Sequence, residues 1–144
     1  MTKSRGNAEG SFILAPEDVQ RLRNVCPDLD EWAESWQVEP ADIGFGRQIV
    51  QVLTPFLLHL LDHGLARSTV RRHGSNLALL GGELIRRRYE DDEFARLDAY
   101  NALQQFIEND EGPLIWPDIT ESAQNAFDAT TRKLNRFMRD STAE

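Results

Sequence analysis

Arginine and hydroxyl side chains crowd one stretch of this 144-residue chain, and together they have the chemistry to hold an anion. Residues 65–89 carry six of the sixteen basic residues, with Glu83 as the only acid. Guanidinium groups form charge-assisted, often bidentate hydrogen bonds with phosphate, and Ser and Thr hydroxyls donate to the same oxygens. We therefore expect this stretch to bind DNA phosphates through Arg67, Ser68, Thr69, Arg71, Arg72, Ser75 and Arg86.

A second group of basic side chains lies near the end of the chain. Arg132, Arg136 and Arg139 recur at steps of four and three, which places them on one side of a helix, with Lys133 beside them. We expect these three arginines to add to the DNA contact from the side. The alternative is that both groups form a solvated face or pair with the acidic run at residues 90–93.

Other residue types that carry chemistry lack the partners they need. His59 and His63 are four apart, with an acid beside the second, but no third ligand follows at a metal-site spacing. Cys26 is the only cysteine and has no neighbour that would make it a nucleophile. The carboxylates occur in runs rather than isolated pairs, and Gly81-Gly82 lacks the strand and the Lys of a phosphate loop. We therefore expect a protein without enzyme activity, metal or other cofactor.

The net charge of −8 is distributed unevenly along the chain. Residues 64–89 carry +5, whereas residues 26–46 carry −6 and residues 90–112 carry −7. A basic segment can bind an anion locally while the rest of the molecule is repelled from it. The acidic segments therefore favour an alternative function, in which the protein docks a basic protein partner or a second copy of itself without binding DNA.

The composition, 40% hydrophobic and 28% charged, is typical of a soluble globular protein. No apolar run reaches the 18 or so residues of a membrane span, and the first twelve residues contain no apolar segment of signal-peptide length. We therefore expect a cytoplasmic protein that makes no membrane contact. Residues 1–10 should form a disordered tail, and residues 11–140 a single helical domain.

Apolar residues recur at steps of three and four through most of the chain, which predicts helices. The periodicity and the turn residues place the helices near residues 16–25, 28–39, 47–63, 68–89, 92–109 and 118–139. Because no alternating strand pattern occurs, the predicted fold class is all-α, a compact multi-helix bundle.

Several residues predict where these helices begin and end. Asp28 with Glu31, and Asp118 with Glu121, match the capping-box pattern, although the last helix could equally start at Thr120. Acidic residues 90–93 suit the first turn of the following helix. Within the third helix, Pro55 either causes a kink or begins a new helix capped by Thr54, and Gly64 supplies a left-handed end.

Some side chains are expected to pack in the core. In the helix at 68–89 one stripe contains Val70, His73, Leu77, Leu80 and Leu84, with His73 expected as a hydrogen-bonded core histidine. Gly74 and Gly81 on the same side predict close approach of another helix; the alternative is a hinge at Gly81-Gly82. We expect core packing rather than a binding platform for Trp32 and Trp36, and we expect the linker to be pinned by Leu114, Ile115 and Trp116.

The segment FLLHLLDHGLARSTVRRHGSNLALL, residues 56–80, resembles the start of the SAM-like core-binding domain of phage integrases and other tyrosine recombinases. In that family an apolar helix ends in Gly-Leu-Ser, and after a short turn a second helix opens with Ser or Asn, Thr, an aliphatic residue and one or two basic residues. The matching positions are Gly64, Leu65, Ala66, Ser68, Thr69, Val70, Arg71 and Arg72, with Ala66 in place of the usual serine.

The resemblance implies a small helical bundle that grips duplex DNA on one face, here over residues 47–140, with residues 11–46 as an N-terminal helical extension. It also implies a role accessory to a mobile element or to site-specific recombination, with a recombinase as a further partner. The family's catalytic His-x-x-Arg motif does not occur, and neither Tyr89 nor Tyr100 sits in a matching context. We therefore expect a DNA-binding module that cuts nothing.

Overall fold

The computed structural model describes residues 15–108 and 112–142, so the expectation for residues 1–10 lies outside the described residues. In these ranges helices account for all the regular structure, and no strand occurs. The prediction of an all-α bundle is confirmed. The elements are α1 (Pro16–Val25), η1 (Leu29–Glu31), α2 (Trp32–Ser35), α3 (Asp42–Asp62), α4 (Arg67–Glu90), η2 (Phe94–Arg96), α5 (Ala99–Phe106) and α6 (Glu121–Thr142).

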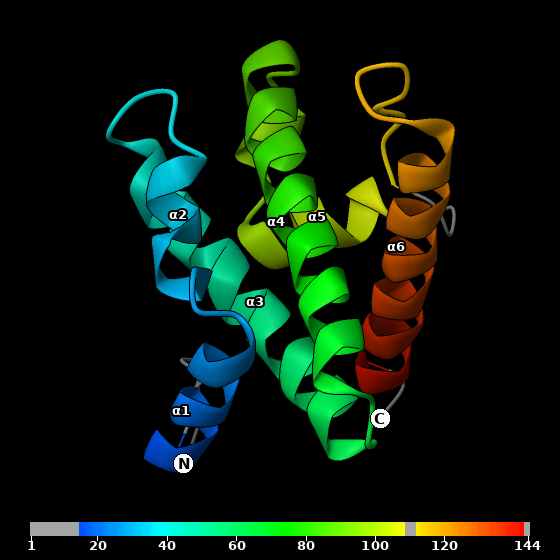
Figure 1. The fold of residues 1–144 in the computed structure, drawn as a ribbon. Coiled ribbons are helices and arrows are strands. Elements are labelled where there is room, and N and C mark those ends of the chain that lie inside the picture. The colour runs from blue at the N-terminus through cyan, green and yellow to red at the C-terminus, as the bar shows by residue number, and fades with distance from the viewer. Residues whose placement is uncertain (1–14, 109–111, 143–144) are drawn as a thin grey trace.

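Helix α4 stands between α1 and α2 on one side and α6 on the other (Figure 1). Helix α6 runs antiparallel to α4, so that its last turns lie beside the first turns of α4 and the end of α3. Gly64, with a φ of 80°, reverses the chain between α3 and α4, as predicted for a left-handed helix end. The start of α4, the end of α3 and the end of α6 therefore meet at one end of the bundle.

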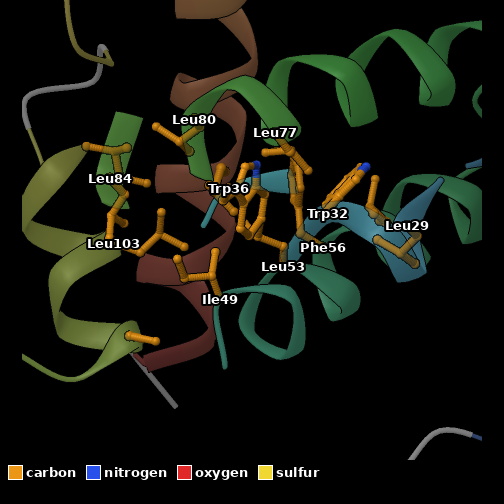
Figure 2. Close-up of a cluster of buried hydrophobic side chains, with 14 of the residues drawn as sticks. Leu29, Trp32, Trp36, Ile49, Leu53, Phe56, Leu77, Leu80, Leu84 and Leu103 are labelled. Carbon is orange, nitrogen blue, oxygen red and sulfur yellow. The ribbon is translucent and has the colours of Figure 1, made fainter. Parts of the chain in front are cut away.

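The core is built on the apolar stripe of α4. Val70, Leu77, Leu80 and Leu84 are completely buried, which confirms the predicted stripe. Figure 2 shows Leu77, Leu80 and Leu84 in one cluster with Ile49, Leu53 and Phe56 of α3 and Leu103 of α5. Burying each such side chain contributes about 1.5–3 kcal/mol. The opposite side of α4 is left to solvent, and this is the side that carries Arg72.

The glycines on α4 allow α2 and the end of α1 to approach closely. A Cβ at Gly81 would lie less than 3.0 Å from ring carbons of Trp36, and one at Gly74 would lie 2.6 Å from Cys26 Sγ. Trp36 is 8% exposed, and its Nε1 donates a 2.7 Å hydrogen bond to Ala78 O. Because α4 continues through Gly81-Gly82, close packing explains these glycines, and the predicted core location of both tryptophans is confirmed.

Two predicted helix starts are wrong, and for the last helix the second of the two predicted starts is the one observed. Asp28 makes no side-chain cap; its carboxylate accepts from Trp32 Nε1 at 3.1 Å, and only η1 and the four-residue α2 follow. The helix expected from residue 92 is divided at Leu97, and α5 starts after Asp98, whose carboxylate accepts from Asn101 N. At α6 the cap is Thr120, whose hydroxyl accepts from Ala123 N, rather than Asp118.

Helix α3 also differs from its prediction. It starts at Asp42, five residues early, and continues through Pro55 without a second cap, because Thr54 Oγ1 donates to Val50 O instead. In the linker before α6, Ile115 is buried, but Leu114 and Trp116 are 74% and 50% exposed. The linker is instead held by Gln124, whose Oε1 accepts from the backbone N–H groups of residues 115 and 116.

Candidate nucleic-acid interface

The basic stretch of α4 is divided between two sides of the helix. Ser68, Arg72, Ser75 and Arg86 follow one another at steps of four, three and eleven residues, so they lie on the outward side, and all four are exposed. Arg67 and Arg71 lie nearer to α1. Thr69 is half-buried, and its hydroxyl accepts a long 3.5 Å contact from Arg72 Nη2.

Arg67 and Arg71 are both anchored to the end of α1. Arg67 Nη2 donates to Asn24 O at 3.0 Å, and Arg71 Nε donates to Val25 O at 3.1 Å. Carbonyls in the last turn of a helix carry partial negative charge, so these bonds are charge-assisted. Each guanidinium has five N–H groups and spends one of them on these bonds. The two side chains are thus positioned by α1 and keep donors on an exposed surface.

A polar network joins α4 to α6 beneath Arg72. His73 Nδ1 lies 2.7 Å from Thr130 Oγ1, and Asn76 Nδ2 donates to the same oxygen at 2.9 Å. The half-buried, hydrogen-bonded His73 confirms its prediction. Burial lowers the pKa of His73 below its ordinary value, and the charges of Lys133 and Arg72 lower it further. Arg72 precedes His73 directly on α4, and Lys133 lies one turn after Thr130, the hydrogen-bond partner of His73 on α6.

Arg72, Lys133 and Arg136 form what we term the α4/α6 basic surface. Lys133 and Arg136 are one turn apart on α6, and Lys133 shares the neighbourhood of His73 with Arg72. All three side chains are exposed. Within residues 15–108 and 112–142 no carboxylate oxygen lies within 4.0 Å of their charged nitrogens. Cations that form no ion pair make a favourable site for an anion.

Lys133 is the member of this surface that sequence reasoning passed over as a site residue. It follows Arg132 directly, and the step of three from Arg136 was visible in the sequence. The position of Lys133 near His73 depends on the antiparallel packing of α6 against α4, because these residues lie on different helices. Thr130 is a polar residue on the apolar side of α6, and this feature of the sequence could have indicated a polar contact with α4 beside Lys133.

The remaining predicted arginines lie elsewhere. Arg86, at the far end of α4, pairs with Glu83 at 3.0 Å. Arg132 is exposed two positions after Thr130, which places it on the side of α6 away from α4. Arg139 lines a groove with Asn101 and Gln104 of α5. The expected single stripe of Arg132, Arg136 and Arg139 is therefore split, and only Arg136 adjoins the start of α4.

The other two arginines of the stretch serve the fold. Arg87 stacks on Phe106, with its guanidinium carbon 5.3 Å from the ring centroid, and Arg88 lies 3.7 Å above the ring of Phe45. Cation–π contacts of this kind contribute about 0.5–2 kcal/mol. Three of the six basic residues in residues 65–89 therefore lie in the second half of α4, remote from the α4/α6 basic surface.

The histidines and the cysteine were the other candidates for chemistry. His63 Nδ1 contacts His59 O at 2.9 Å, and no group of three potential metal ligands occurs among the described residues. Cys26 is buried, and burial raises the pKa of its thiol to about 11, with Asp28 adding to the effect and Arg71 opposing it.

No helix in the described ranges is long and apolar enough to cross a membrane.

Comparisons with protein-family models, with curated proteins and with solved structures find no match to this chain. The resemblance to the recombinase core-binding domain therefore rests on residues 56–80 of the sequence alone.

Proposed function

We propose that this protein is a non-catalytic DNA-binding module that holds the phosphate backbone of duplex DNA on its α4/α6 basic surface. The observation that carries the proposal is the hydrogen bond between His73 and Thr130, which joins α4 to α6 with Arg72 beside the first residue and Lys133 one turn after the second. No carboxylate oxygen lies within 4.0 Å of the charged nitrogens of either cation among the described residues. Phosphate contacts of this type position a protein on DNA without reading its sequence.

Neighbouring groups support the same surface. Ser68 lies one turn before Arg72 and Ser75 one turn after it, so their hydroxyls flank the guanidinium on the outward side of α4. Arg67 and Arg71, fixed by the end of α1, extend the line of donors along the first turns of the helix. The resemblance of residues 56–80 to the recombinase core-binding domain favours the same end of α4 and an accessory role in recombination.

The test is charge reversal with a matched control. The double variant Arg72→Glu with Lys133→Glu removes two cations of the surface, and Arg86→Glu with Arg132→Glu makes the same change in net charge outside it. Binding to a mixed-sequence duplex would be measured by fluorescence anisotropy over a range of salt concentrations. Because each lost phosphate contact removes about one unit from the log–log salt dependence, we expect the first variant to lower the slope by about two.

The control separates a local contact from general repulsion. At low salt we expect the first variant to bind at least about ten-fold more weakly and the control to stay within about two-fold of the unmodified protein. Unchanged binding by the first variant, or equal losses in both, would refute the proposal. Circular dichroism and thermal melting of both variants check that the fold is kept.

A second function is favoured by the opposite end of the bundle. Tyr89 OH donates to Asp42 at 2.7 Å and contacts Glu39 at 3.2 Å, which brings the end of α4, where the acidic run 90–93 begins, together with the acidic loop before α3. This end could dock a basic protein surface, including the α4/α6 basic surface of a second copy. Sedimentation velocity tests the latter: salt-sensitive association supports it, and a monomer at every concentration up to about 100 µM at low ionic strength excludes it.

A further inference from the structure

An open groove of about 400 Å³ lies between the end of α3 and the last turns of α6. This volume falls within the roughly 300–1,000 Å³ typical of small-ligand sites. Aromatic rings from both helices and cations from α6 line the groove, above a floor of buried Phe56 and Leu60. It adjoins the α4/α6 basic surface because Lys133 and Arg136 belong to both.

Three rings are held in place along the groove. The centroids of His59 and His63 are 4.1 Å apart, and those of His59 and Phe137 are 4.9 Å apart. Phe137 also contacts the buried Phe56 at 5.6 Å, which ties its ring to the core. His63 is fixed by the contact between its Nδ1 and the carbonyl of residue 59. The rings are tilted by 41° and 49° to one another, and the exposed ring of His63 is the one on which a flat, aromatic ligand can stack.

The charged groups of the groove select for an anion on that ligand. Lys133 and Arg136 are two cations against one carboxylate, Asp140. A nucleotide has this combination of features, because its base has an aromatic face and its phosphate a negative charge. Aspartate also accepts hydrogen bonds from exocyclic amino groups of bases. Proteins that bind single strands combine a basic track with stacking side chains in the same way.

We propose that this groove receives an unpaired base of DNA whose neighbouring phosphates lie on the α4/α6 basic surface. The proposal rests on the proposed function and specifies its substrate, namely DNA with a single-stranded end or gap. Bases in an intact duplex are stacked on both faces, so only an unpaired base can stack on His63 and its neighbours.

The experiment compares a duplex that carries a short single-stranded overhang with the same duplex made blunt. The overhang contains 2-aminopurine, whose emission changes when it stacks. We expect the unmodified protein to prefer the overhang by about five-fold or more, the lower end of what one stacked base contributes. His63→Ala should abolish this preference and the emission change, and His63→Phe should keep both. Trp116→Ala removes an exposed aromatic ring outside the groove and should also keep both.

The possible results separate the two proposals. Equal affinity of the unmodified protein for both DNAs, combined with a loss of binding on reversal of Arg72 and Lys133, overturns the groove and leaves the duplex function standing. An overhang preference that persists in His63→Ala also overturns the groove. Failure of the unmodified protein to bind either DNA overturns both proposals.

Discussion

Replacing Gly81 with alanine should destabilise the bundle, although alanine is the better helix former. A methyl group at this position would lie less than 3.0 Å from three ring carbons of Trp36. That ring is 8% exposed, and its Nε1 donates to Ala78 O at 2.7 Å, so it cannot move without breaking a buried hydrogen bond. The Trp36 side chain and the backbone of α4 at residue 81 therefore cannot both keep their positions in the variant.

Three contributions decide whether Gly81→Ala raises or lowers the free energy of unfolding. Alanine in place of glycine stabilises a helix by about 1 kcal/mol. Forcing a methyl group into a packed core costs about 1–3 kcal/mol, and weakening the indole hydrogen bond costs about 0.5–1.5 kcal/mol. We expect the free energy of unfolding to fall by about 2 kcal/mol, within a range of about 0.5–3.5 kcal/mol. The melting temperature should drop by roughly 4–8 °C for a chain of this size.

The control is Gly44→Ala in α3, where an added Cβ meets nothing within 4 Å. This variant should gain about 0.5–1 kcal/mol, because only the conformational entropy of the unfolded chain changes. Urea denaturation followed by circular dichroism gives both free energies, and an unchanged slope with urea concentration shows that the unfolding transition is comparable. A Gly81→Ala variant as stable as the unmodified protein would show that α2 does not press on α4 as described.

Three further outcomes follow from individual groups. Because burial raises the pKa of Cys26 to about 11, from an ordinary thiol near 9, a thiol reagent at pH 8 should react at least about 100-fold more slowly with the native than with the urea-unfolded protein; equal rates would contradict this. Burial and nearby cations lower the pKa of His73, so the unfolded chain takes up the proton first. The contribution of His73 to the free energy of unfolding should therefore be complete above about pH 6.5 and be lost as the pH is lowered. His73→Gln should remove this dependence on pH; the same pH dependence in the variant and the unmodified protein would contradict the assignment. Burial tends to raise the pKa of Asp42, but hydrogen bonds from backbone N–H groups and from Tyr89 outweigh it and lower the pKa. Tyr89→Phe should then lower the free energy of unfolding by about 1 kcal/mol at pH 7, measured by urea denaturation, and this loss should become smaller as the pH falls and Asp42 is protonated. A loss independent of pH would exclude this pairing.

Local patterns were sufficient for the bounds of α1 and for the buried stripe of α4. Pro16 and the spacing of Leu22 and Val25 predicted the bounds of α1, and the α4 stripe was read correctly from Val70 to Leu84. These features depend on periodicity within one element and on backbone preferences that need no distant partner. Gly64 belongs to the same class, because its left-handed φ is a property of a single residue.

Capping could not be predicted as well, because a carboxylate near a helix start has several possible donors. Asp28 accepts from an indole, and Asp42 accepts from the backbone of the preceding loop and from Tyr89, 47 residues away. Which donor is present depends on how the chain returns. A capping-box pattern in the sequence is therefore not sufficient for a cap, and Asp98 and Thr120 cap their helices without one.

The sequence by itself determined that this chain forms helices, which side of α4 enters the core, and that basic residues lie in the first two and the last two turns of that helix. Only the tertiary structure decided which of those cations act together. Side chains from separate helices meet through packing, and the antiparallel contact of α6 with α4 brings Lys133 to Arg72 while it turns Arg132 away. The physical reason is that helical periodicity is encoded within a few turns, whereas electrostatic partnership depends on distances between elements.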